Sequence, residues 1–110
     1  MTKLQGELGL ARRGGFITFG EDLLFKLSRN RVWLVLLAAD CGRRAARDIG
    51  LARQNTPVLT TVFTKEELGR LIEARPLNAI GITNSGLAEK ITETLRKEGE
   101  ADVEIQKQEK

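Results

Sequence analysis

The sequence predicts an α/β protein in which helices cover both faces of one sheet. Short apolar runs alternate along the chain with segments whose apolar residues recur three or four positions apart, which is typical of helices between strands. The longest apolar run, "VWLVLLAAD" at 32–40, is bounded by charges and has the pattern of a strand covered on both faces. Parallel strands need crossover helices, and crossovers are right-handed. We therefore expect a three-layer α/β/α sandwich around a mixed sheet of about four strands.

The first half of the chain predicts three helices and two strands. The segment 4–15 places Leu4, Leu8 and Ala11 on one side of a helix that stops at Gly14-Gly15. The residues that follow predict a short strand at 16–18, a helix at 21–29, the covered strand at 32–40 and a helix at 42–55. The last helix has a buried stripe of Ala45, Ala46, Ile49 and Ala52, with arginines on its other side.

The second half continues the alternation. Pro57 is the first residue of a predicted strand at 57–63, a position that does not need a backbone N–H for pairing with a neighbouring strand. Thr64 and Glu67 have capping-box spacing and predict a helix over 64–74. A strand at 76–83 and a helix at 85–99 follow. We therefore assign residues 1–98 to a single domain and residues 99–110 to a charged, mobile C-terminal tail, with an edge strand as the alternative for the tail.

The composition indicates a globular chain and disfavours an enzyme. With 110 residues, 41% of them hydrophobic and 30% charged, the chain is long enough for one core. No run is long and apolar enough for a membrane helix, and the first residues lack a signal-peptide pattern, so we expect a cytoplasmic protein without membrane contact. A single cysteine excludes an internal disulfide. There is no histidine and no tyrosine, which removes the usual general base, and we expect no catalysis, metal or cofactor.

The charge is distributed unevenly. Residues 1–53 carry ten Lys/Arg against five Asp/Glu, whereas residues 54–110 carry eight against ten. Guanidinium groups bind phosphate in a bidentate way and stack on bases, so an arginine-rich half suits RNA, although a solvated helix face would look the same. The arginines of this half are Arg12, Arg13, Arg29, Arg31, Arg43, Arg44, Arg47 and Arg53.

The start of the second helix has two interpretations. Thr18 and Glu21 have the spacing of a capping box, and Glu21 and Asp22 suit the positive end of a helix dipole. Alternatively, the carboxylates accept hydrogen bonds from base amino or imino groups while Lys26, one turn later, meets a phosphate. The neighbouring glycines, Gly14, Gly15 and Gly20, would let another backbone approach closely.

Cys41 and Arg47 form a Cys-x5-Arg pattern between a strand and a helix, which resembles the phosphate loop of protein tyrosine phosphatases. A phosphate cradle needs amides curled toward one centre, whereas the intervening "RRAA" favours a straight helix. Phosphatase chemistry is therefore a remote alternative to a small, semi-buried cysteine.

Two further apolar side chains have open assignments. Leu77 belongs either to the core at the start of a strand or to an apolar loop tip that packs on an unstacked base. Trp33 could stack on a base, but we expect it to pack at the head of its strand, because five aromatic residues are too few for a stacking platform.

Four blocks, "LGLARRGGFITFGEDLLFK", "WLVLLAADC", "PVLTTVFTKEELGRLI" and "RPLNAIGITNSGLAEKI", resemble in order the L-seven-Ae / L-thirty-e ribosomal protein family, and most of all its bacterial YlxQ-type members. The resemblance runs from Leu4 to Leu95. It implies an α/β/α sandwich and binding to kinked RNA, typically a kink-turn with tandem sheared G·A pairs.

The resemblance also assigns roles to positions of this chain. The family's RNA-binding helix begins at Gly20, and its basic position one turn later is Lys26. In strong kink-turn binders, Asn-Glu reads the guanines of the G·A pairs from the positions where this chain has Asp22 and Leu23. These binders also have two lysines where this chain has Thr18 and Phe19, so the sequence departs from them at both places. The loop that covers a flipped base corresponds to residues 75–79.

We therefore expect a non-enzymatic RNA-binding protein whose partner is a structured RNA, ribosomal RNA being one candidate, with no small-molecule substrate. A protein-interaction module on the same fold, with the acids and Leu77 as the partner patch, is the alternative. The predicted RNA-binding residues are Arg13, Gly15, Gly20, Glu21, Asp22, Lys26, Arg75, Pro76, Leu77, Asn78 and Ala79.

Overall fold

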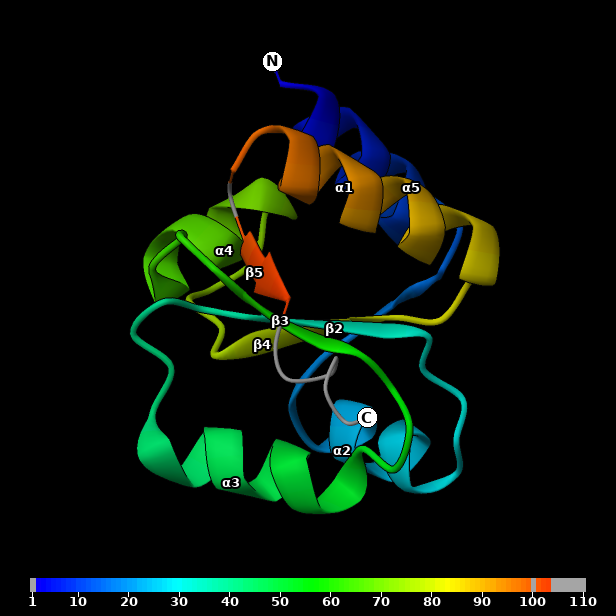
Figure 1. Cartoon of the computed structure of the whole chain (residues 1–110), viewed down its shortest axis with the longest axis vertical. Coiled ribbons are helices and arrows are strands. Elements are labelled where there is room, and N and C mark those ends of the chain that lie inside the picture. Colours follow the sequence, from blue (N-terminus) through cyan, green and yellow to red (C-terminus); the bar gives the residue numbers. More distant parts are fainter. Residues whose placement is uncertain (1, 100, 104–110) are drawn as a thin grey trace.

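A mixed sheet with helices on both faces forms the protein, as the sequence predicts (Figure 1). The computed structural model describes residues 2–99 and 101–103. Strands β2 and β3 run parallel and are joined by a helix, whereas the other neighbouring pairs are antiparallel. In the sheet order β1-β4-β2-β3-β5, the strands are β1 (Ile17–Thr18), β4 (Ala79–Ile82), β2 (Leu34–Leu37), β3 (Val58–Thr61) and β5 (Ala101–Val103).

The helices form the two outer layers of the sandwich (Figure 1). One face of the sheet is covered by α1 (Lys3–Arg13), α4 (Lys65–Leu71) and α5 (Ser85–Lys97). The other face is covered by α2 (Gly20–Ser28) and α3 (Arg43–Ala52). Alternate residues of β2 supply the two cores, since Leu34 and Leu36 pack in the first and Val35 in the second. None of the described helices is long and apolar enough to cross a membrane.

The predicted end of α1 and the predicted start of α4 are confirmed, whereas α4 ends at Leu71 and not at residue 74. In α4, the Glu67 N–H donates to Thr64 Oγ1 at 3.2 Å and the Thr64 N–H donates to Glu67 Oε1 at 3.0 Å, which completes the capping box. Helix α1 ends at Arg13, and Gly15 follows with φ +79°, a conformation that glycine adopts readily.

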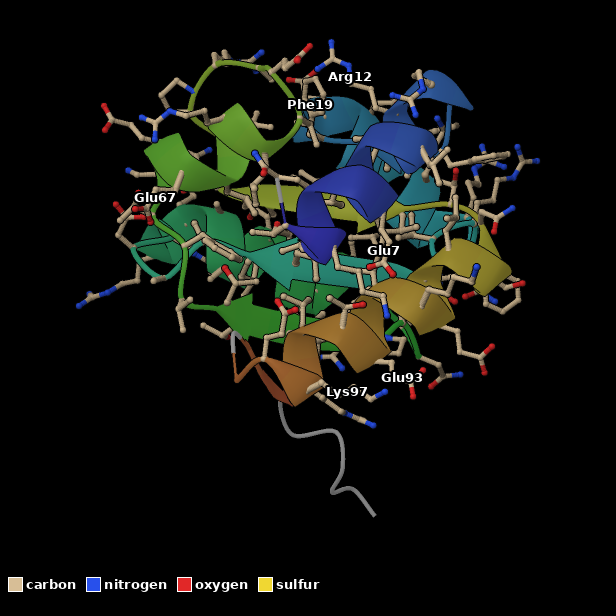
Figure 2. All side chains as sticks on the ribbon, turned by 90° about the horizontal axis from the view of Figure 1, so that it is seen from above. Glu7, Arg12, Phe19, Glu67, Glu93 and Lys97 are labelled. Carbon is tan, nitrogen blue, oxygen red and sulfur yellow. The ribbon has the colours of Figure 1, made fainter. Side chains whose placement is uncertain are left out.

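One buried carboxylate joins α1 to α5. Glu7 lies on the apolar side of α1, with an exposed fraction of 9%, and the Thr94 hydroxyl donates to Glu7 Oε2 at 3.0 Å (Figure 2). The other oxygen, Glu7 Oε1, is buried and has no hydrogen-bond partner among the described residues.

Part of the segment predicted to be a tail forms the edge strand β5. Residues 101–103 pair antiparallel with β3, with Asp102 opposite Thr60. The alternative of an edge strand therefore holds for these residues. The rest of the predicted tail after Gly99, residue 100 and residues 104–110, lies outside the described residues.

The expected packing of Trp33 at the head of its strand is wrong. Its backbone N–H donates to the Ile82 carbonyl at 2.8 Å, so the main chain lies in the sheet. The side chain nevertheless stays 57% exposed, because it lies at the end of the sheet beside Pro57 and the start of α5. This end is opposite the one where β4 begins, since Leu34 pairs with Ile82 and Leu37 with Ala79.

Candidate functional site

A pocket of about 360 Å³ opens between the N-terminal tip of α2, the first turns of α3 and the loop that joins α4 to β4. The pocket floor is mainly apolar and its rim is polar. Its lining residues are Gly20, Glu21, Leu23, Leu24, Ala45, Asp48, Ile49, Arg75, Pro76, Leu77, Asn78 and Ala79.

Strand β1 and a glycine of β4 set the position of the α2 tip. Thr18 pairs with Gly81, and the chain turns into the helix at Gly20, where φ is +65°. A Cβ on Gly81 would lie 2.9 Å from Thr18 Cγ2 and 2.5 Å from Leu23 Cδ1. Glycine at this position therefore lets α2 lie against the sheet.

The amide groups at the α2 tip are free to bind an anion. The N-cap residue is Phe19, whose side chain makes no capping hydrogen bond. Within the described part of the chain, no acceptor is found for the N–H groups of Gly20, Glu21 and Asp22. Unpaired amides and the positive end of the helix dipole together favour a negatively charged group at this tip.

The predicted capping box of Thr18 and Glu21 is wrong. Pairing with β4 holds Thr18 in β1, so α2 begins two residues later, and the Thr18 hydroxyl donates to Asp22 Oδ2 at 2.7 Å. Lys26 Nζ donates to the same oxygen at 3.0 Å. These two hydrogen bonds, that of Thr18 above all, lower the pKa of Asp22. Glu21 lines the pocket, and no ion pair of its carboxylate is found among the described residues.

The loop from Arg75 to Asn78 is fixed to both neighbouring helices. The Arg75 guanidinium lies over the Phe19 ring, 5.6 Å from its centroid, next to the α2 tip. Asn78 Oδ1 accepts from the Gly42 N–H at 2.9 Å, at the start of α3. Gly69 of α4 packs directly against the loop backbone, since a Cβ there would lie 2.8 Å from the Arg75 carbonyl carbon. The loop is therefore a pre-formed wall of the pocket.

Of the two assignments left open for Leu77, the core at the start of a strand is confirmed and the exposed apolar tip is wrong. Leu77 is 5% exposed and packs in the core beneath α4, where its N–H donates to the Lys65 carbonyl at 3.1 Å. Ala79 is also 5% exposed because it is the first residue of β4, in the core shared with α2 and α3. Pro76 is the exposed apolar residue of the loop. The apolar surface at this site is a recess, and it does not protrude.

The structure brings most of the predicted residues together. Gly20, Glu21 and residues 75–79 line the pocket, whereas Asp22 and Lys26 lie on α2 outside its lining. Arg13 lines a different hollow, between α1 and α4, and Gly15 lies in the exposed turn after α1.

Sequence reasoning missed the contribution of α3. Ala45 and Ile49 were assigned to a buried stripe of this helix, and Asp48 had no role, yet all three line the pocket. The helical spacing of Ala45 and Ile49 was the available signal. It shows which side of α3 is apolar, but only the packing of α3 beside α2 shows that this side opens into a pocket.

The surroundings of Cys41 differ from a phosphate loop. Helix α3 begins at Arg43, so the residues from Arg43 to Arg47 continue straight into the helix and do not form a loop. Burial raises the pKa of the Cys41 thiol, which disfavours the nucleophilic thiolate.

Solved structures with the same architecture are similar to this chain, two of them from Bacillus halodurans and Giardia lamblia. No family model matches the sequence, and no curated protein matches it. A protein of unknown function from Bacillus halodurans matches with a TM-score of 0.72 and 26% identity, over 87% of this chain and 99% of that one. The 15.5kD RNA binding protein of Giardia lamblia matches with a TM-score of 0.59 and 24% identity, over 88% of each chain. The chain therefore shares its α/β/α fold, over 87% of its length, with a Bacillus halodurans protein of unknown function and, over 88%, with a Giardia lamblia RNA-binding protein.

Proposed function

We propose that this chain is a non-enzymatic RNA-binding protein of the cytoplasm that recognises kinked, structured RNA. The observation that carries the proposal is the pocket between the α2 tip and the loop 75–79. It joins free helix amides, an exposed arginine and an apolar recess on one surface, and these are groups that bind phosphate and an unstacked base. The shared fold with an RNA-binding protein of Giardia lamblia supports the same assignment.

Each part of the pocket has a role in this proposal. The free amides of the α2 tip and the Arg75 guanidinium bind phosphate oxygens. The recess takes an unstacked base against Pro76, Ala45 and Ile49. The carboxylates of Glu21 and Asp48, on two different helices, accept hydrogen bonds from base amino or imino groups. A kink-turn provides such an exposed base beside a sharply bent backbone, and a ribosomal RNA is one source of it.

The test is a binding assay with a kink-turn RNA and an unkinked duplex of equal length, at salt concentrations from about 50 to 200 mM, the range over which phosphate contacts weaken measurably. We expect the kinked RNA to bind more tightly. Ala45→Leu fills the recess without altering charge and should abolish this preference. Arg75→Ala should weaken binding to both RNAs and reduce the salt slope by about 1.

Arg31→Ala is the matched control, because Arg31 is exposed between α2 and β2, at the opposite end of the sheet. It should leave the preference for kinked RNA unchanged. Micromolar or weaker binding to both RNAs, indifferent to salt, would contradict the proposal.

A protein-interaction module is the second candidate. The buried position of Leu77 removes one component of the partner patch expected from the sequence. The 57% exposure of Trp33 beside Pro57 is the observation that favours a protein partner, because tryptophan is enriched in interface hot spots. Protein partners recovered after nuclease treatment, and lost with Trp33→Ala, would support this candidate.

A further inference from the structure

We infer that the groove between α1 and α4 is a second RNA contact, which binds the phosphodiester backbone of the RNA held at the pocket. This inference rests on the proposed function. The groove has a volume of about 490 Å³ and lies between two helices that cover the same face of the sheet. Its charged lining residues are Arg12 and Arg13 from the end of α1, Arg70 from the last turn of α4 and Glu73 from the turn that follows α4.

Among the described residues, the arginines of the groove have no ion-pair partner. All three are exposed, and the ion pairs found in the described part of the chain, Lys26–Asp22 and Lys97–Glu93, do not include them. Glu73 is thus not within 4 Å of any of the guanidinium groups. Three unneutralised guanidiniums around one hollow raise the local potential and favour a polyanion, whose phosphates guanidinium binds in a bidentate way.

Two glycines of α1 line the groove without a structural reason to be glycine. A Cβ on Gly6 would meet no atom within 4 Å, and a Cβ on Gly9 would meet only Arg13 Nη1 at 3.6 Å, an ordinary contact. Glycine inside a helix is unfavourable relative to alanine. The absence of side chains at these two positions leaves the α1 backbone open to close approach by a ligand in the groove.

The groove lies on the face of the sheet covered by α1 and α4, the pocket opens toward α2 and α3, and the chain that leaves α4 connects the two. Residues 70–73 line the groove and residues 75–79 line the pocket, so one segment of chain forms a wall of both. In Figure 2, Arg12 and Phe19 lie toward the same edge of the molecule, whereas Glu93 and Lys97 lie toward the opposite edge. Because both surfaces adjoin this segment and this edge, one RNA can contact both, which favours the backbone of the same RNA over an unrelated acidic protein.

The test uses two kink-turn RNAs with the same kinked core, one with a long flanking helix and one with that helix trimmed. The double variant Arg12→Gln/Arg70→Gln should weaken binding to the long RNA by tenfold or more, reduce its salt slope by about 2 and leave the trimmed RNA unaffected. Gly6→Ala/Gly9→Ala should raise Tm and yet weaken binding to the long RNA, a combination that a merely structural role for these residues would not give.

The controls separate this inference from the proposed function. Arg31→Gln, which also removes one exposed arginine, should bind both RNAs like the wild type. If the Arg12/Arg70 variant binds both RNAs normally while Arg75→Ala does not, the groove inference fails and the proposed function stands. If the wild type binds neither RNA, both fail. Displacement of the long RNA by polyglutamate as effectively as by a competing RNA duplex would indicate an acidic protein as occupant and would overturn the inference.

Discussion

At the residue scale, Asp22 differs most from the role that its position implies. Asp22 Oδ2 accepts hydrogen bonds from both Thr18 and Lys26, while the resemblance places base recognition at this position and the next. The carboxylate therefore holds the start of α2 to β1. Lys26 is drawn into the same contact, so its ammonium is shared between Asp22 and any phosphate. The two carboxylates that line the pocket belong to other residues, Glu21 on α2 and Asp48 on α3.

The role of Asp22 predicts a pH dependence. Its pKa in the folded protein is lowered from the ordinary value of 3.8, so its contribution to stability is complete above that value and is lost as the pH falls through the folded pKa. Asp22→Asn should therefore lower Tm at pH 7, and the difference from the wild type should shrink as the pH falls below about 4. Thermal unfolding of both proteins between pH 2.5 and 7 measures this, with Glu21→Gln as the control. A difference that stays constant over this range would contradict the assigned contact.

Residue spacing predicts which side of a helix is buried, but it does not predict the contacts of a polar residue on that side. Spacing correctly places Leu4, Leu8 and Ala11 on the buried side of α1, and Glu7 lies on that side too. The sequence gives no sign of its partner, because Thr94 is 87 residues away and meets it only when α1 and α5 pack together. The prediction for Trp33 errs in the other direction, because an apolar residue expected to be buried is exposed. The strand beside it is buried, but Trp33 lies past the end of the covered sheet.

At the element scale, helix ends were predictable wherever local chemistry decides them. The capping box at Thr64 and the glycine stop after α1 depend on residues within one turn, and both are confirmed. The start of α2 was not predictable in the same way, because the pairing of β1 with β4 outweighs the local capping preference of Thr18. Long-range pairing of this kind overrides short-range signals.

Gly69 of α4 carries the next prediction, because it determines where the pocket wall lies. A Cβ there would collide with the Arg75 carbonyl group and approach the Ala74 carbonyl oxygen to 3.0 Å, and backbone atoms cannot move away cheaply. Gly69→Ala should lower the free energy of unfolding by about 1–3 kcal/mol and weaken RNA binding, as overpacking shifts the loop 75–79. Urea unfolding and RNA titration measure the two effects.

The matched control for Gly69→Ala is Gly50→Ala, in an open position of α3 that lines neither the pocket nor the groove. It should raise the free energy of unfolding by up to about 1 kcal/mol, since alanine is the better helix former. Equal stability changes in the two variants would mean that Gly69 does not set the loop position.

At the scale of the whole molecule, the sequence predicts the layers, while the structure alone reveals the pocket. Alternating apolar runs and helical stripes are enough to predict an α/β/α sandwich with a mixed sheet. The family resemblance, and not the periodicity, implies that the α2 tip and the loop after α4 share one binding surface. The third wall, from α3, depends on which helix packs beside α2 on the same sheet face. That neighbour relation follows from the strand order β1-β4-β2-β3-β5, in which β2 and β4 are adjacent although α3, β3 and α4 separate them in the chain.

The sheet order also predicts what β5 does for the protein. Strand β5 covers the outer edge of β3, and without it the N–H and C=O groups of that edge would be open to pairing with a second chain.

A chain that ends at Gly99 should therefore be less stable by about 1–2 kcal/mol, from the loss of three cross-strand pairs, and should self-associate at high concentration. A chain that ends at Val103 keeps the pairing and serves as the control. Urea unfolding and sedimentation velocity distinguish the two chains, and RNA binding should be equal in both, because the pocket lies beside β4 on the other side of β2. If the two chains unfold at the same urea concentration, β5 does not protect this edge, and the stability of the sheet rests on β1 to β4 alone.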